Sequence, residues 1–190
     1  MRLALQHLQS LLGNCIKFKE QSYSKDSLMV VDEDGHACHS SLGYQPNYNY
    51  NDYDINGKIA LAPDRCFKSG IGVIQHEFLH ALGLSHEHQR EDRDNYVTIH
   101  WDNIEDGMAR NFEKCNKNQC QRFGLEYDYL SVMHYQKDTL SKGGNTITAG
   151  GNMHIAGLDE VAMTEKLGNG FAGPNIHDIN LVQYFYNCPG

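Results

Sequence analysis

One eleven-residue segment combines three histidines with a carboxylate. Residues 76–86 are HEFLHALGLSH, which has the spacing H-E-x-x-H-x-x-G-x-x-H. His76 and His80 are four residues apart, so on a helix both imidazoles project from one face and can reach the same ion. Glu77 lies about 100° around that helix from His76, close enough to act on a metal-bound water without being a ligand. This spacing predicts a zinc site on a helix.

A third ligand, His86, requires the helix to end before that residue. In a continuous helix His86 would lie about 15 Å beyond His76, too far away to reach the same ion. Gly83 accepts the left-handed conformation that ends a helix and reverses the chain, so His86 can return to the metal from another side. Three nitrogen ligands leave a coordination position for water, which indicates one catalytic Zn²⁺ per chain rather than a structural ion.

Zinc held in this way is suited to the hydrolysis of peptide bonds. The ion lowers the pKa of a bound water towards about 7, and Glu77 can accept the proton of that water. Glu77 can then give the proton to the leaving amine as a general acid. The alternative is that these histidines are ordinary helix-surface or core residues, which would make the five matching motif positions a coincidence.

The zinc segment needs a helix and a fold around it. The pattern over residues 71–82 is helical, and Gly83 is its expected stop. The other expected elements are helices at residues 2–12, 102–112 and 178–186, strands at 15–18, 27–31 and 58–62, an ordered loop at 36–56, and a glycine-rich, irregular region at 141–173. No internal repeat, charge block or linker is visible, so residues 1–190 are expected to form a single domain.

Charge and hydropathy exclude several classes of partner. The chain has 24 acidic and 16 basic residues, for a formal net charge of −8. Nucleic acids and anionic membrane surfaces both require a basic patch, so neither is expected as a main partner. No apolar run approaches the roughly 20 residues that span a bilayer. Residues 2–12 follow the spacing of an amphipathic helix rather than that of a signal peptide, so no secretion signal is expected in this sequence.

Six cysteines form an even set without any C-x-x-C pair. In an oxidising compartment such a set indicates three disulfides, for which the sequence alone allows fifteen connectivities. The alternative is six reduced thiols in a cytosolic protein. We expect a secreted, extracellular protein. The cysteines are Cys15, Cys38, Cys66, Cys115, Cys120 and Cys188.

Two further segments resemble a known family. Residues 86–97, HEHQREDRDNYV, follow the extended signature of astacin-family metalloproteases, within the metzincins, and residues 131–135, SVMHY, resemble the Met-turn of that family. The resemblance extends from the Cys15 region to Cys188. It implies an α+β, metzincin-like catalytic domain with a twisted N-terminal sheet, two long helices, and an irregular C-terminal subdomain. Subdomains are expected at about 1–86 and 87–190, with the cleft between them.

The resemblance assigns roles to individual side chains. It implies that His76, His80 and His86 bind zinc and that Glu77 is the general acid/base. Tyr135 would be an additional, displaceable ligand that stabilises the tetrahedral intermediate, a role for which a phenol donor is suited. Met133 would form a hydrophobic floor beneath the metal. Without the zinc motif before them, Met133 would be interpreted as ordinary core and Tyr135 as an ordinary aromatic residue.

The resemblance also implies disulfide pairs and a substrate-binding strand. It suggests Cys15–Cys188 and Cys38–Cys66. The two remaining cysteines have no counterpart in the basic pattern of the family, and we expect a local Cys115–Cys120 bond, with free thiols or an intermolecular bond as alternatives. Residues 58–62 resemble an edge strand that pairs with an extended protein or peptide substrate along the cleft. The protein is expected to be a monomer.

The sequence departs from the family pattern at its start. It begins within the first helix, so the first strand and the inhibitory pro-segment of the family are expected to be absent. The N-terminus of a family domain approaches the position of Glu87, and Glu87 is therefore expected to be an unpaired acid. Residues 90–94 are expected to form an ion-pair network that holds the loop of the third ligand. His88, His100 and His134 are interpreted as structural residues.

Three functions compete on these residues. The first is a secreted zinc endopeptidase that acts on proteins. The second is a catalytically weak or inactive astacin-like binding or adhesion protein, which would have no need of Glu77. The third is a purely structural zinc site, against which the three-ligand set argues.

Overall fold

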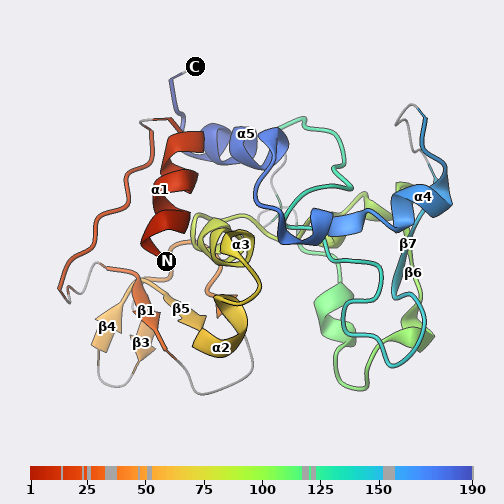
Figure 1. Ribbon diagram of the computed structural model, residues 1–190, viewed down its shortest axis with the longest axis horizontal. Coiled ribbons are helices and arrows are strands. Elements are labelled where there is room, and N and C mark those ends of the chain that lie inside the picture. Colours follow the sequence, from red (N-terminus) through yellow and green to blue (C-terminus); the bar gives the residue numbers. More distant parts are fainter. Residues whose placement is uncertain are drawn as a thin grey trace. The chain divides into compact units, whose positions relative to one another are not determined.

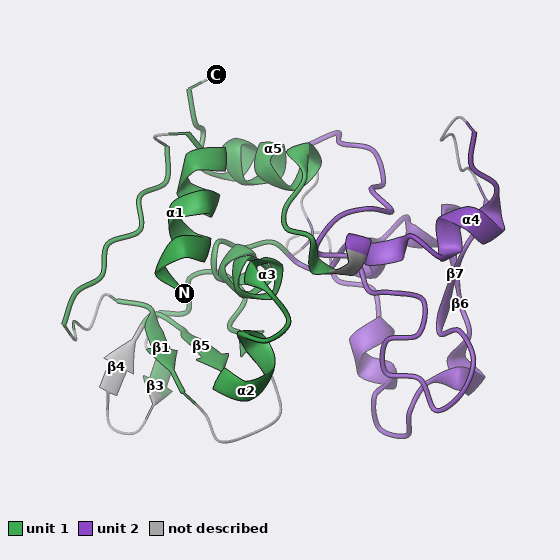
Figure 2. Cartoon of the chain, viewed as in Figure 1, with its two compact units in different colours: residues 1–84, 171–190 green, residues 85–170 purple. Residues whose placement is uncertain are grey.

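The structure is a computed structural model of the chain (Figure 1). It divides into two compact units, residues 1–84 with 171–190 and residues 85–170 (Figure 2). The expected C-terminal subdomain, about 87–190, includes residues 171–190. In the structure these residues belong to the first unit. The residues that the structure describes are 1–13, 15–22, 24, 27–32, 38–46, 48–50, 53–116, 120, 123–151 and 157–189.

The first unit is built on a buried helix, α3 (Ile71–Ala81), in which every residue from Gly72 to Leu79 is buried. An amphipathic helix, α1 (Arg2–Leu11), packs against it and buries Ala4 and Leu8. The Gln75 Nε2 group of α3 donates a hydrogen bond of 3.1 Å to the Ala4 carbonyl of α1. The other helices of this unit are α2 (Pro63–Cys66) and α5 (Ile176–Phe185), which begins with a capping box between Asn175 and Asp178.

A three-stranded sheet in the first unit has the order β1-β5-β2. Strand β5 (Lys58–Leu61) pairs in parallel with β1 (Met29–Val31) and antiparallel with β2 (Cys38–Ser40). A separate hairpin joins β3 (Tyr48–Tyr50) and β4 (Tyr53–Ile55). Strand β5 is therefore the central strand, and the expectation that residues 58–62 form a free edge is wrong, because hydrogen bonds occupy both of its sides.

The strand expected at residues 15–18 is not formed. Cys15 is held by a disulfide bond to Cys188, and the Phe18 ring packs edge-on against Phe78, with 5.7 Å between ring centroids. A disulfide near the end of α5 and a ring contact with α3 thus position this segment in place of strand pairing.

The second unit surrounds a short antiparallel pair, β6 (Val97–Ile99) with β7 (Ile147–Ala149). The helix expected at residues 102–112 is replaced by two 3₁₀ turns, η3 (Trp101–Asn103) and η4 (Ala109–Phe112), with Gly107 between them at a φ of 84°. The remaining helical elements are η1 (Glu87–Gln89), η2 (Arg93–Asn95), α4 (Glu160–Thr164) and η5 (Leu167–Phe171), whose last residue belongs to the first unit. The buried core of this unit is Val97, Ile99, Ile104, Phe112, Tyr127, Tyr129, Ile147, Ala149, Met163 and Leu167.

Three disulfides confirm the expected pairing. Cys15–Cys188, Cys38–Cys66 and Cys115–Cys120 have Cα–Cα distances of 5.5, 5.8 and 6.0 Å. The first closes 173 residues of chain and therefore removes the most freedom from the unfolded state, about 5 kcal/mol on a loop-entropy basis. Among the described residues, no helix is long and apolar enough to cross a membrane.

The first turn of α3 comes close to the backbone at Phe171. A Cβ atom added to Gly72 would overlap the Phe171 carbonyl oxygen and lie 2.6 Å from its carbonyl carbon. Glycine is therefore required here by space, although alanine is normally the better helix former. The first turn of the helix that carries the zinc motif thus packs directly against the Phe171 backbone.

Gly72→Ala tests this constraint. We expect the free energy of unfolding in urea to fall by about 2 kcal/mol or more, because only a movement of the chain can relieve the overlap. The control is Gly150→Ala, whose new Cβ would have Glu160 Oε1 as its nearest neighbour at 3.8 Å. A Gly72→Ala protein as stable as the parent would contradict the close approach.

Candidate metal centre

Helix α3 ends in a way that turns the chain back towards its own last turn. Gly83 has a φ of 102°, and its N–H donates to the His80 carbonyl at 2.9 Å. The Leu84 N–H reaches the Leu79 carbonyl at 3.0 Å. This pair of hydrogen bonds is the Schellman motif, for which glycine is suited because it has no Cβ. The expected role of Gly83 as the helix stop is thus confirmed.

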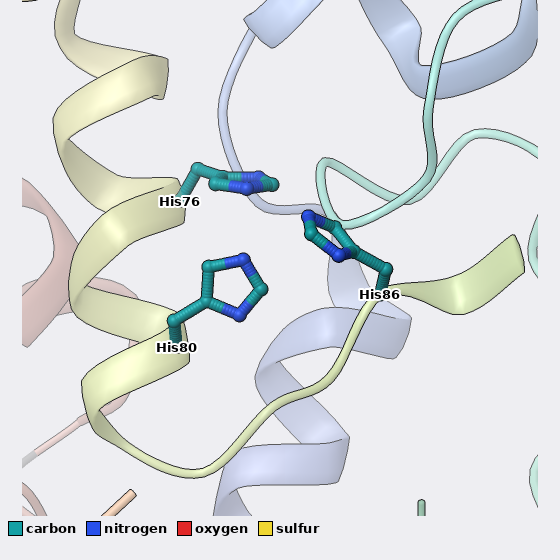
Figure 3. A group of neighbouring side chains, drawn as sticks. All are labelled: His76, His80 and His86. Atoms are coloured by element: carbon teal, nitrogen blue, oxygen red, sulfur yellow. The ribbon is translucent and has the colours of Figure 1, made fainter. Parts of the chain in front are cut away.

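The three histidines of the motif come together just beyond this turn. Figure 3 shows the rings of His76 and His80 projecting from one side of α3, with the His86 ring turned towards them from the following segment. Each ring offers a nitrogen atom that lies within 4.8 Å of the other two. The His76 and His80 rings meet edge-on, with 4.6 Å between centroids. Among the described residues, this is the group of histidine, cysteine and acidic side chains that could hold a metal ion.

Hydrogen bonds orient two of the three rings. His80 Nδ1 lies 2.6 Å from the Leu84 carbonyl oxygen, and His86 Nδ1 lies 3.3 Å from Gln89 Oε1. Because both oxygens can only accept, Nδ1 carries the proton in each ring and Nε2 is left with a lone pair for a metal. Neutral imidazoles with their second nitrogen held by an oxygen are the usual ligands of Zn²⁺, so this donor set fits zinc.

Glu77 is a buried carboxyl group, and among the described residues no ion pair to it is found. It is 4% exposed, and its Oε2 atom has no hydrogen-bond partner among the described residues. Burial raises the pKa of Glu77 to about 8. A buried oxygen atom without a partner is costly unless water or a substrate group reaches it. Glu77 is therefore a buried carboxyl group whose Oε2 atom can still take a hydrogen bond from water or a substrate.

Glu87 has partners, and the expectation of an unpaired acid is wrong. Glu87 Oε1 forms a short ion pair with Arg90 Nη1 and accepts a 2.9 Å hydrogen bond from the Asp128 N–H. Burial raises the pKa of Glu87 to about 7, and Arg90 opposes a further rise. Arg90 also donates two hydrogen bonds of 3.1 Å to Asp92, one from its Nε and one from its Nη2. The segment that follows His86 is thus fixed from within the second unit.

A second arginine completes the expected network over residues 90–94. Arg93 pairs with Asp94, which also contacts Lys114 Nζ at 2.6 Å. Arg93 Nη1 donates to the carbonyl oxygens of His88 and Phe112, both at 2.9 Å. Because Arg93 is 4% exposed, these hydrogen bonds are shielded from water and hold the backbone after His86 against η4.

The Met-turn residues lie beside this segment. Met133 is 2% exposed, and its carbonyl accepts a 2.9 Å hydrogen bond from the Glu87 N–H. The Tyr135 ring packs against His86, with 4.7 Å between centroids. His134 Nδ1 donates to the Tyr135 carbonyl at 2.6 Å, while its Nε2 accepts from the Tyr127 hydroxyl at 2.7 Å. Burial lowers the pKa of His134 to about 4, which keeps this ring neutral.

Sequence reasoning missed three neighbours of the zinc motif. They are the Leu84 carbonyl that orients His80, the Gln89 side chain that orients His86, and the Phe171 ring, which lies edge-on to His76 with 5.7 Å between centroids. Of the three, only Gln89 is predictable from nearby sequence, because an amide three residues after His86 can reach the Nδ1 atom of that histidine. The carbonyl and Phe171 leave no such signal.

Comparisons with known proteins agree on one family. The family model described as Astacin, a peptidase family, matches residues 1–181. Zinc metalloproteinase nas-13 of Caenorhabditis elegans is 35% identical over 179 residues, which are 92% of this chain and 34% of that protein. High choriolytic enzyme 1 of Oryzias latipes is 36% identical over 178 residues, 92% of this chain and 56% of that protein. Meprin A subunit beta of Rattus norvegicus is 39% identical over 132 residues, 70% of this chain and 17% of that protein.

A solved structure has the same fold. High choriolytic enzyme 1, a hatching enzyme zinc-protease from medaka, matches with a TM-score of 0.77 at 30% identity, over 99% of this chain and 83% of that one. The expected α+β, metzincin-like fold is thus confirmed. The chain spans between 17% and 56% of the length of the three relatives named above.

Zinc binding tests the histidine cluster directly. We expect the parent protein to retain close to one zinc ion per chain after dialysis, measured by mass spectrometry, and His86→Ala to bind zinc more than about 100-fold more weakly. His177→Ala, which removes an exposed histidine from the start of α5, should bind zinc as the parent does. Equal affinities of the His86→Ala and His177→Ala proteins would remove His86 from the ligand set.

Proposed function

The chain belongs to the astacin family of peptidases, and on this premise we propose that it is a secreted zinc-dependent endopeptidase that hydrolyses peptide bonds in proteins. The observation that carries the proposal is the convergence of the His76, His80 and His86 ring nitrogens within 4.8 Å, next to the buried carboxyl of Glu77. A bound zinc ion would supply Lewis-acid chemistry, polarising a peptide carbonyl and making water more acidic.

Glu77 is the proposed general acid/base. It directly follows the proposed ligand His76 on α3, and its Oε2 atom, which has no hydrogen-bond partner among the described residues, can accept a proton from water. A pKa that burial holds above the usual range suits a group that must also return the proton to the leaving amine. A cation at the three histidines would favour the ionised form and so adjust this balance.

Tyr135 is the proposed stabiliser of the tetrahedral intermediate and a displaceable metal ligand. Its ring packs against His86, so a phenol hydroxyl is available in the neighbourhood of the proposed zinc ligands. A hydrogen bond from a phenol O–H to a developing oxyanion strengthens as negative charge forms, which is the requirement for lowering the barrier rather than only binding substrate.

Strand β2 is the proposed contact for an extended substrate backbone. It is the antiparallel edge of the sheet, whereas β5 is paired on both sides. Shortly after β2, the Gly43 N–H donates to the His80 carbonyl at 2.8 Å, which fixes the end of this strand to the helix that carries two of the ligands. Main-chain pairing at such an edge recognises peptides with little dependence on their side chains.

Secretion and the active state are also proposals. All six cysteines are in disulfides, which form and persist in oxidising compartments. The alternative is a weak or inactive binding or adhesion protein. Such a protein would gain no function from Glu77, although burying a carboxyl group destabilises the fold. We therefore favour an active enzyme that acts as a monomer on protein or peptide substrates.

Glu77→Gln separates chemistry from metal binding. Digestion of casein should slow by about 10²–10⁴-fold because the proton acceptor is lost, while zinc content stays near one per chain. The exposed Glu105→Gln is the matched control and should digest as the parent does. The chelator 1,10-phenanthroline should abolish the activity of the parent, and added zinc should restore it. Unchanged digestion by Glu77→Gln would disprove its assignment.

Tyr135→Phe tests the phenol alone. We expect turnover to fall by about 10²-fold, because one oxyanion donor is lost, with KM and zinc content close to those of the parent. Tyr184→Phe, at a half-exposed tyrosine of α5, is the control. If Tyr135→Phe instead loses its zinc at unchanged turnover per bound ion, the hydroxyl serves metal retention and not catalysis.

A further inference from the structure

The Tyr135 ring is held among three other rings of the second unit. The nearest is His88, at 4.0 Å between centroids and an interplanar angle of 26°, which is a stacked arrangement. The His86 ring is at 4.7 Å and tilted by 59°, and the Phe112 ring is at 5.5 Å and nearly perpendicular. Of these three neighbours, only His88 lies nearly face to face with the phenol.

His88 is itself fixed. Its side chain is fully buried, and its Nε2 donates to the Asn111 carbonyl at 3.0 Å, since that oxygen can only accept. The His88 carbonyl accepts a hydrogen bond from Arg93 Nη1 at 2.9 Å, so the backbone at this position is held as well. The Asn111 carbonyl belongs to η4, which Arg93 also binds through the Phe112 carbonyl. The stacked imidazole is therefore a fixed surface and not a mobile neighbour.

We propose that His88 is a positioning residue for Tyr135: its buried ring confines the phenol to one plane, within which the hydroxyl can approach and leave the proposed zinc ligands. This role rests on the proposed function of Tyr135. A ring packed face-on against a fixed ring cannot tilt without losing that contact, but it can slide parallel to it. A displaceable donor must move within the plane of its ring but must not tilt out of it. A phenol that tilts loses its alignment with the oxyanion.

The plain alternative is that His88 only fills space and bonds to η4. The two roles depend on different parts of the imidazole, the face of the ring and the Nε2–H group, so two substitutions separate them. His88→Gln keeps an N–H donor for the Asn111 carbonyl but removes the ring. His88→Phe keeps a ring to stack on Tyr135 but removes the donor. His100→Gln is the matched control, since His100 is a partly buried histidine of the same unit that contacts Thr148.

The proposal predicts how the kcat values of the three variants compare. We expect His88→Gln to lower kcat by about three- to tenfold with KM within about twofold of the parent, the size expected for the loss of one aromatic pair. His88→Phe and His100→Gln should stay within about twofold in both constants. The reverse order, with His88→Phe impaired and His88→Gln normal, would assign His88 to the support of η4 and overturn the proposal.

A double-mutant cycle asks whether the effect passes through Tyr135. In the Tyr135→Phe background, where the hydroxyl is gone, His88→Gln should cause no further fall in kcat. An equal fall in both backgrounds would show that His88 acts on the site by another route. Urea unfolding of each variant, compared with His100→Gln, separates this coupling from a general loss of stability.

Copper(II)-substituted protein gives a readout that does not depend on peptidase activity. Coordination of the Tyr135 phenolate to copper(II) produces a visible charge-transfer band, which we expect in the parent and in His88→Phe but clearly weaker in His88→Gln. A parent that binds copper without this band, or a band of equal strength in all three proteins, would overturn the positioning role. A parent that shows the band but does not cleave peptides would contradict the proposed function and leave the positioning role supported.

Discussion

The end of α3 is the constraint on which the site depends. A helix leaves its last carbonyl groups without partners inside the helix, and each must find one elsewhere. Here the Leu79 carbonyl is bonded by the Leu84 N–H, the His80 carbonyl by the N–H groups of Gly83 and Gly43, and the Leu82 carbonyl by the Tyr186 hydroxyl at 3.3 Å. The donors come from the turn, from the segment after β2 and from the end of α5. The same hydrogen bonds that complete the helix thus tie the sheet and α5 to the turn that precedes His86.

Leu84 links this termination to His80, one of the proposed zinc ligands. Its N–H closes the Schellman motif on Leu79, and its carbonyl accepts from His80 Nδ1. The turn therefore both ends the helix and sets the tautomer of His80. Leu84 is 1% exposed, so neither hydrogen bond competes with water. The left-handed conformation of Gly83 is the local condition for both, which explains why the spacing of the motif includes a glycine.

Local geometry could be predicted from the sequence, whereas long-range partners could not. The helix, its stop at Gly83 and the convergence of His76, His80 and His86 follow from helical periodicity and the properties of glycine, which act over a few residues. The place of residues 58–62 at the centre of the sheet depends on strands more than fifteen residues away, and alternation alone does not tell a central strand from an edge. The partner of Glu87 is local, since Arg90 follows three residues later, whereas the resemblance to the family implies a partner at the N-terminus.

In the second unit, one acceptor holds the side chains that orient both His86, the third proposed ligand, and Tyr135. The Asn111 carbonyl receives Gln89 Nε2 at 3.1 Å and His88 Nε2 at 3.0 Å. Gln89 contacts His86 through its other amide atom, and His88 stacks on Tyr135. A carbonyl oxygen has two lone pairs, so both donors can be satisfied at once. A displacement of η4 would therefore disturb the orientation of the histidine and the plane of the phenol together. A main-chain hydrogen bond opposes such a displacement, because the Cys115 N–H, shortly after η4, donates to the Gln89 carbonyl at 2.8 Å.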